Sequence, residues 1–228
     1  GGSESAAGAV EYPKKPIQVV ASFGAGGAND VLARIAAKTA EKYLGQPIVV
    51  QNYAGGGQVT GQIEAWNAPT DGYTLLTINP GIIQNPIMKK NLPFTYKDWE
   101  IITLYNLEPE VFVVRADSPY KTYADVIEAS KKGTFLIATP GALTNPHICG
   151  MYMEKQTGAK FQYVHGGSGS EEILQLLGGH VDGVINTIGA VYSAVEEGKA
   201  RVLGVMGEEV PGVVSKIAPY AATFYSQN

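Results

Sequence analysis

The stretch with the most evident chemical use is SFGAGGAND, which runs from Ser22 to Asp30. Its small residues leave backbone N–H groups uncovered. A helix-like segment follows at once and directs its positive end at the same point. Such a turn either receives an anion, which is a nucleotide phosphate or a carboxylate, or has only a structural role. The residues that form this turn are Gly24, Ala25, Gly26 and Gly27.

The nucleotide alternative fits the sequence poorly. A dinucleotide fingerprint requires a third glycine where Asn29 stands, and an acidic residue at the end of the second strand, where the chain has Gln51 and Asn52. No glycine-rich P-loop with its lysine occurs anywhere in the chain. The predicted ligand of this turn is therefore a carboxylate, which accepts two or three hydrogen bonds from N–H groups. Asp30 either caps the helix together with Asn29 or also faces the ligand.

The composition is that of a globular protein without a nucleic-acid partner. The chain has 228 residues and a net charge of −4, and no cluster of Lys or Arg exceeds a pair. Its one cysteine, Cys149, allows no internal disulfide and is interpreted as a buried thiol. His147 and His165 form no triad or metal-ligand spacing with it, so no catalytic group, metal or cofactor is predicted.

The hydrophobic pattern predicts two α/β lobes. Strands alternate with helices over the first hundred residues, which implies a parallel sheet, and a second ladder of strands and helices follows. The helix after the first loop places several residues on one face at helical spacing: Val31, Leu32, Ile35, Ala36, Thr39 and Tyr43. The expected organisation is a tether over 1–11, lobe 1 over 12–104, lobe 2 over 105–206 and a tail over 207–228 that makes an incomplete return to lobe 1.

Glycine-rich loops follow strands in both lobes, and in such sheets ligands bind at the carboxyl ends of the strands. The second lobe has its loop at TPGALTNPH, between a strand and a helix. Two such edges that face each other form a cleft, and closure about a hinge traps a ligand between them.

In its sequence motifs the chain resembles the solute-binding receptors of tripartite tricarboxylate transporters, also called Bug receptors. The resemblance spans residues 12 to about 206, and its motifs occur in the family's order. They are YPKKPIQVVASFGAGGANDVLAR, NYAGGGQVTG, APTDGYTLL, LLGGHVDGVIN and VEEGKARVLGVM.

The resemblance implies the type II periplasmic-binding-protein fold, a two-lobed Venus flytrap with a central cleft. It also implies that a small carboxylate is bound there without chemistry, between one loop from each lobe. In the first loop it points to Phe23, with Gly24, Gly26, Gly27 and Asp30. In the second it points to Gly141, Thr144 and His147, although Thr144 also suits a helix cap and His147 also suits packing against the neighbouring turn.

The chain departs from the family pattern at several positions. Leu143 replaces the middle glycine of the second-lobe loop. Where the family has a basic residue before the next helix, this chain has His165 to Ser168, so a distal carboxylate lacks that partner. Ser168, Asn79 and Asn186 are the further polar candidates for ligand contact.

The resemblance also bears on the ends of the chain. Family receptors are exported, so the segment 1–11 is interpreted as a tether after a cleaved signal or a lipid-bearing cysteine, with an artificial leader as the alternative. Family members continue well beyond residue 206 and return to the first lobe, whereas the tail here is short.

The leading hypothesis is an extracytoplasmic receptor that delivers a carboxylate to a tripartite membrane transporter, without catalysis, as a monomer with or without a lipid anchor. Its expected partners are the small carboxylate and the permease subunits. One alternative is a carboxylate sensor that signals to a membrane partner. The other is an α/β nucleotide-dependent enzyme, for which the chain offers few acid–base groups.

Overall fold

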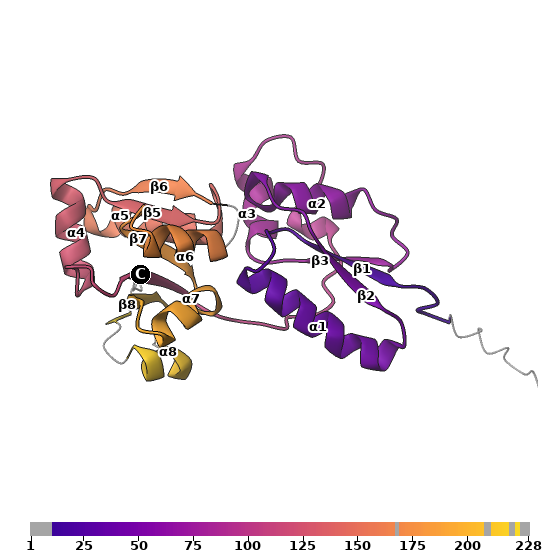
Figure 1. The fold of residues 1–228 in the computed structure, drawn as a ribbon. Coiled ribbons are helices and arrows are strands. Elements are labelled where there is room, and N and C mark those ends of the chain that lie inside the picture. The colour runs from indigo at the N-terminus through magenta and orange to yellow at the C-terminus, as the bar shows by residue number, and fades with distance from the viewer. Residues whose placement is uncertain (1–10, 167–168, 208–210, 219–221, 224–228) are drawn as a thin grey trace, which may run out of the picture.

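Two α/β lobes make up the molecule in the computed structural model, which describes residues 11–166, 169–207, 211–218 and 222–223. Figure 1 shows the first lobe on the right and the second on the left. Within the described residues the chain passes once between them, along the extended stretch 99–109.

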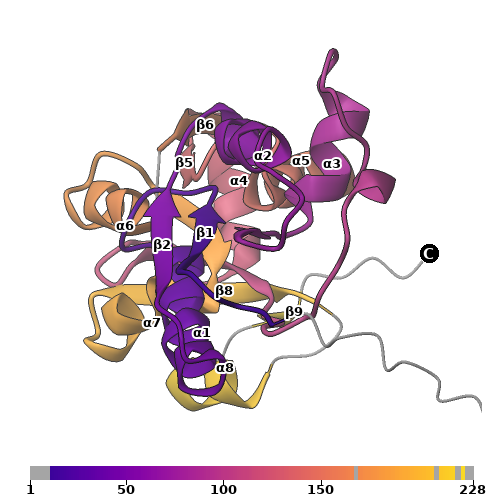
Figure 2. The same ribbon diagram turned by 90° about the vertical axis from the view of Figure 1, so that its right-hand side faces the viewer.

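The first lobe is built on a three-stranded parallel sheet in the order β2-β1-β3. Helices α1 and α2 lie on opposite faces of this sheet, as both ribbon views show (Figures 1 and 2). Right-handed crossovers between parallel strands place them there. The elements are β1 (Ile17–Ala21), α1 (Ala28–Leu44), β2 (Ile48–Asn52), η1 (Gly56–Gln58), α2 (Val59–Trp66), β3 (Thr74–Thr77), α3 (Gly81–Met88) and η2 (Tyr96–Asp98).

The sequence predicts that α1 packs on the sheet through the face that carries its larger apolar side chains. The structure instead buries a different face of the helix. Ala33 and Ala37 are buried, whereas Val31, Ile35 and Tyr43 are 47%, 58% and 84% exposed. The alanines let the helix axis approach the strands closely. The buried first-turn aspartate of α1 is hydrogen-bonded to the end of β2, which fixes the rotation of the helix.

The second lobe is built on a six-stranded mixed sheet in the order β6-β5-β7-β4-β8-β9. Strand β4 runs antiparallel to both β7 and β8, while β5, β6 and β7 are parallel. The elements are β4 (Glu110–Arg115), α4 (Tyr123–Lys132), β5 (Leu136–Thr139), α5 (Asn145–Thr157), β6 (Gln162–His165), α6 (Gly169–Leu177), β7 (Gly183–Thr187), α7 (Ile188–Glu196), β8 (Ala200–Met206), α8 (Gly212–Ile217) and β9 (Ala222–Thr223).

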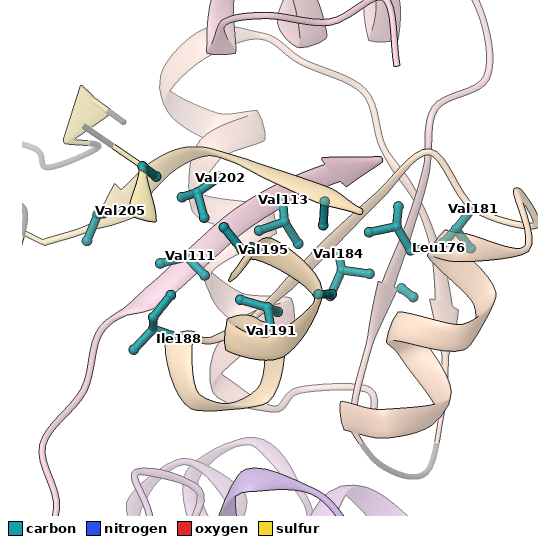
Figure 3. Close-up of a cluster of buried hydrophobic side chains, with 14 residues drawn as sticks. Val111, Val113, Leu176, Val181, Val184, Ile188, Val191, Val195, Val202 and Val205 are labelled. Atoms are coloured by element: carbon teal, nitrogen blue, oxygen red, sulfur yellow. The ribbon is translucent and has the colours of Figure 1, made fainter. Parts of the chain in front are cut away.

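Helices cover both faces of this second sheet. Because side chains alternate along a strand, Val111 and Val113 of β4 point into one cluster and Phe112 and Val114 into the other. Figure 3 shows the first cluster, where valines from β4, β7 and β8 meet Val191 and its neighbours on α7. The second cluster packs under α4 and α5.

The helix ends follow local signals in the sequence. Gly45 takes the left-handed conformation that ends α1, with φ of 68°, as its position after the helix predicts. Thr122 begins α4 with a capping box, in which its hydroxyl accepts from the Asp125 N–H and the Asp125 carboxylate accepts from the Thr122 N–H. A threonine directly before a helical segment, with an aspartate three residues later, predicts this cap from residue type and spacing.

The described part of the tail joins the second lobe. Strand β9 pairs with β8, and Ala218 is buried in the cluster beneath α7 and α8. The expected return to the first lobe is therefore not made by these residues. Of the 18 large hydrophobic side chains that are exposed among the described residues, 11 lie between residues 12 and 96 in the first lobe, five on the connecting stretch 99–109 and two further along in the second lobe. The first lobe therefore exposes more large apolar side chains than the second.

We expect this asymmetry to appear in hydrogen exchange. Both clusters of buried hydrophobic residues that the described chain forms lie in the second lobe. The amides of β1 should therefore exchange at least about tenfold faster than those of β4, equal to about 1.4 kcal/mol of opening free energy. Native-state exchange measured by mass spectrometry tests this. Equal protection in the two strands would mean that the lobes open as one unit.

Candidate functional site

A pocket of about 390 Å³ lies between the two lobes. Its walls come from the carboxyl ends of parallel strands in both sheets: β1 and β2 from the first lobe, β5 and β6 from the second. This is the edge at which ligands bind in open α/β sheets. The lining residues are Ser22, Phe23, Gly55, Gly56, Gly57, Gln58, Lys89, Pro140, Gly141, Ala142, His165 and Gly166.

Three helices begin next to this pocket. Gly57 and Gln58 precede α2, the stretch 140–142 leads into α5, and Gly166 comes shortly before α6. The first N–H groups of a helix have no acceptor within the helix, and the macrodipole places about half a positive charge at that end. Three such helix ends beside one pocket favour the binding of an anion there.

The loop before α2 has a backbone that glycine makes accessible. Gly55, Gly56 and Gly57 all have positive φ, at 126°, 59° and 60°. Gln58 follows with φ of 79°, a conformation that is uncommon for a residue with a side chain. The amide of Asn85 donates to the Gly57 carbonyl at 2.9 Å and holds the loop in place.

At this loop the two lobes touch. A Cβ atom on Gly57 would lie 2.7 Å from the carbonyl oxygen of Ala142 in the second lobe. Elsewhere between the lobes, Gln84 Nε2 of α3 donates to Asn145 Oδ1 of α5 at 3.4 Å. Position 57 therefore requires glycine, because a side chain there would collide with the second-lobe loop at Ala142.

The first glycine loop contributes less to the pocket than the sequence suggests. Phe23 lines the pocket, whereas the stretch 24–27 is not among the lining residues. A Cβ on Gly26 would lie 3.6 Å from the Ser170 hydroxyl of α6, so this loop faces the second lobe. The Gly26 N–H donates to Asp30 Oδ2 at 2.9 Å and is thus already paired.

Asp30 is buried and fully engaged within the first lobe. Its Oδ1 accepts from Asn52 Nδ2 and from the Arg34 guanidinium, both at 2.9 Å. Burial raises the pKa of this carboxyl, but hydrogen bonds from Arg34, Gly26 and Asn52 outweigh that effect and hold the pKa below its usual range. Asp30 therefore fixes the loop to the end of β2 in its charged form.

In the second-lobe loop, Gly141 lines the pocket and the other two predicted residues support it. The Thr144 hydroxyl is buried and donates to the Gly141 carbonyl at 2.7 Å. His147 Nδ1 accepts from the Leu143 N–H at 2.9 Å. Leu143 has φ of 59°, the left-handed conformation that favours the glycine of the family pattern.

Two histidines stand beside this loop. The ring of His147 packs against Tyr163 at 4.4 Å and against His165 at 4.8 Å between centroids. His165 lines the pocket, and its Nδ1 lies 2.8 Å from the Thr139 hydroxyl. Burial lowers the pKa of both histidines, and the proximity of His165 lowers that of His147 further. Both rings are neutral at pH 7.

The remaining candidates lie away from the pocket lining. Asn79 Oδ1 accepts from the Gly81 N–H at the start of α3. Asn186 is buried and donates to the Glu172 carboxylate at 2.6 Å. Ser168 lies outside the described residues.

Two buried carboxyl groups lie behind the cleft. Glu110, at the start of β4, accepts from Asn145 Nδ2 at 2.9 Å, and Glu172 of α6 accepts from Asn186. One oxygen of each, Oε2 of Glu110 and Oε1 of Glu172, has no hydrogen-bond partner among the described residues. Burial raises the pKa of Glu110 to about 7 and raises that of Glu172 well above its usual range.

Sequence reasoning missed part of the pocket wall. Lys89 was overlooked because the helix that precedes it, α3, was not predicted. The loop 55–58 is not among the site residues that the sequence predicts, although its run of glycines before a helix is a signal for one.

The described residues offer little for catalysis or metal binding. They contain no group of three or more His, Cys, Asp or Glu side chains that could hold a metal ion. Burial raises the pKa of the Cys149 thiol to about 12, so it is protonated at neutral pH. A helix long and apolar enough to cross a membrane is likewise absent from the described part of the chain.

Two α/β lobes with a pocket at the facing strand ends define the class of two-lobed solute-binding proteins. The family model described as tripartite tricarboxylate transporter family receptor, TctC, matches residues 32–219. The chain belongs to this family. A UPF0065 protein from the gbd 5′ region of Cupriavidus necator is 36% identical over 209 residues, which are 87% of this chain and 61% of that protein.

Solved structures agree with this assignment. The periplasmic binding protein BugD is 26% identical, with a TM-score of 0.84 over 93% of this chain and 71% of that one. MatC from Rhodopseudomonas palustris with bound malate shares the fold at 22% identity, with a TM-score of 0.82 over 91% of this chain and 72% of that one. The present chain spans about three fifths of the length of the curated relatives.

Proposed function

We propose that the protein is an extracytoplasmic receptor that captures a small organic carboxylate in the pocket between its lobes and delivers it to a tripartite tricarboxylate-type membrane transporter. The observation that carries the proposal is that three helices begin beside the pocket, an arrangement that favours an anionic ligand. No carboxylate side chain is among the described residues that line it. Membership of the family and the malate bound to MatC support the proposal.

In this proposal the ligand carboxylate accepts hydrogen bonds from backbone N–H groups on both sides of the cleft. Phe23 and the loop 55–58 supply the first-lobe wall, and Gly141 with its neighbours supplies the second-lobe wall. Asp30, Thr144 and His147 position the loops through the hydrogen bonds described above. Gly24, Ala25, Gly26 and Gly27 close against α6 when the lobes meet. Asn79 and Asn186 lie away from the pocket lining, where they hold the start of α3 and the Glu172 carboxylate, and Ser168 remains a proposed contact for ligand atoms beyond the carboxylate.

Closure is the step that would turn binding into a signal for the transporter. A ligand that contacts both walls favours the arrangement in which Gly57 meets Ala142, because it has a different affinity for open and closed forms. The closed form presents a surface to a membrane partner that the open form lacks.

The test is the thermal unfolding of the intact protein with a panel of carboxylates. A ligand present at 100 times its Kd stabilises the folded state by about 2.7 kcal/mol, which raises Tm by about 5–10 °C in a chain of this size. We expect at least one dicarboxylate, tricarboxylate or aromatic acid to do so, while nucleotides leave Tm unchanged. If every acid in the panel leaves Tm unchanged, the proposal is wrong.

A further inference from the structure

One cation stands at the wall of the pocket. Lys89 directly follows α3, is half-buried, and its ammonium donates to the carbonyl oxygen of Gly56. A Cβ on Gly57 would lie 2.8 Å from its Nζ atom, so the ammonium is at the loop where the two lobes meet.

The charge of this ammonium is not balanced within the pocket. Lys89 is the one Lys or Arg among the described lining residues, and those residues include no Asp or Glu. None of the ion pairs between described residues includes Lys89. Burial lowers the pKa of its ammonium. A partly desolvated cation without a counter-ion is unfavourable, and an anionic ligand group offsets that cost.

The position of Lys89 gives the pocket two separate anion-binding features. Backbone N–H groups at the starts of α5 and α6 lie on the second-lobe side, and the ammonium of Lys89 comes from the first lobe. A dicarboxylate can place one carboxylate at the second-lobe N–H groups and the other at the ammonium of Lys89. A pocket of about 390 Å³ is at the lower end of the range for small-molecule sites, which suits a small, compact diacid.

We propose that Lys89 determines the specificity of the site by pairing with a second anionic group of the ligand, so that the protein selects dicarboxylates over monocarboxylates and over amino acids. The inference rests on the proposed function, since it needs a carboxylate in the pocket. Amino acids are disfavoured because their own ammonium would face Lys89 without a carboxylate among the described lining residues to receive it.

The structure also supplies a matched control. Lys90 is the next residue, carries the same charge and is exposed. Lys90 does not line the pocket, so Lys90→Met changes the net charge of the protein by the same amount as Lys89→Met but leaves the site intact. Lys89→Gln is a second variant that keeps a donor for the Gly56 carbonyl.

The experiment is a double-mutant cycle by isothermal titration calorimetry at pH 7.5. Its ligands are succinate, glutarate and adipate, each paired with its half-amide, which removes one charge at nearly constant shape. We expect the wild type to prefer one diacid over its half-amide by at least about tenfold, the ratio for 1.4 kcal/mol. Lys89→Met and Lys89→Gln should abolish that preference without weakening the half-amide, and Lys90→Met should keep it.

The outcomes separate the two proposals. If the acids bind but Lys89→Met and Lys89→Gln keep the diacid preference, or if the wild type has none, this inference is overturned while the proposed function stands. If the wild type binds none of these acids, this inference is overturned, and the wider panel of the thermal unfolding test decides the proposed function. Thermal unfolding without ligand shows whether each variant is folded, and Lys89→Gln decides the outcome should Lys89→Met not fold.

Discussion

Gly57→Val should abolish carboxylate binding while the protein still folds. The new Cβ would lie 2.7 Å from the Ala142 carbonyl oxygen and 2.8 Å from Lys89 Nζ. The ammonium ends a flexible side chain and can move aside, but the backbone of the second lobe cannot yield without opening the cleft. We expect affinity to fall by about 100-fold or more, equal to about 2.8 kcal/mol, as measured by calorimetric titration of a carboxylate that stabilises the wild type.

Backbone strain needs its own control. A valine at φ of 60° lowers the stability of the folded protein by about 1–2 kcal/mol at any position, whether or not it meets another residue. Gly45 provides that control. It has φ of 68°, also in the first lobe, and a Cβ there would meet nothing within 4 Å. Gly45→Val should lose a similar amount of stability yet bind normally. If Gly57→Val retains wild-type affinity, the ligand does not lie where the two loops meet.

The first glycine loop shows which features of the site the sequence predicts and which it does not. Glycine spacing and the missing acid at the end of the second strand excluded a nucleotide, and the order of the motifs gave the family. The sequence could not show that Gly26 has its N–H already paired with Asp30. That pairing depends on how the side chain of Asp30 is anchored to Asn52, a contact between residues far apart in the chain.

Local signals predicted the helix ends well and the buried faces less well. Gly45 and Thr122 act within one turn of the backbone, so their roles follow from residue type and position. The face of α1 is decided by tertiary contacts instead. There the small size of Ala33 and Ala37 outweighs the hydrophobicity of larger neighbours such as Ile35, which is 58% exposed.

Lys89 was missed because its helix has weak sequence signals. Segment α3 is short, has Pro80 at its N-cap position and contains Pro86, which argues against a helix in sequence-based reasoning. Without that helix, nothing in the sequence separates Lys89 from its neighbour Lys90. Only the folded chain shows that one ammonium meets the pocket and the other faces solvent.

Glu110→Gln should make the protein more stable at pH 8 and leave its stability at pH 4.5 nearly unchanged. Burial raises the pKa of this carboxyl to about 7 in the folded state, against 4.5 as its ordinary value. Between these values the folded state keeps a proton that the unfolded state has lost, so the free energy of unfolding falls as pH rises and levels off above pH 7. The loss is about 3 kcal/mol, from about 1.4 kcal/mol per pKa unit.

The glutamine variant keeps a neutral side chain that accepts from Asn145, as the protonated acid does. Urea unfolding at several pH values between 4.5 and 8 measures the effect. Glu172 lies close enough for Glu110 to raise its pKa, so the variant retains a smaller pH dependence of the same sign. Glu128→Gln, an exposed carboxylate of α4, is the control and should change stability by no more than about 0.5 kcal/mol at any pH. Parallel curves for wild type and Glu110→Gln would show that the Glu110 carboxyl is ionised in the folded protein at little cost.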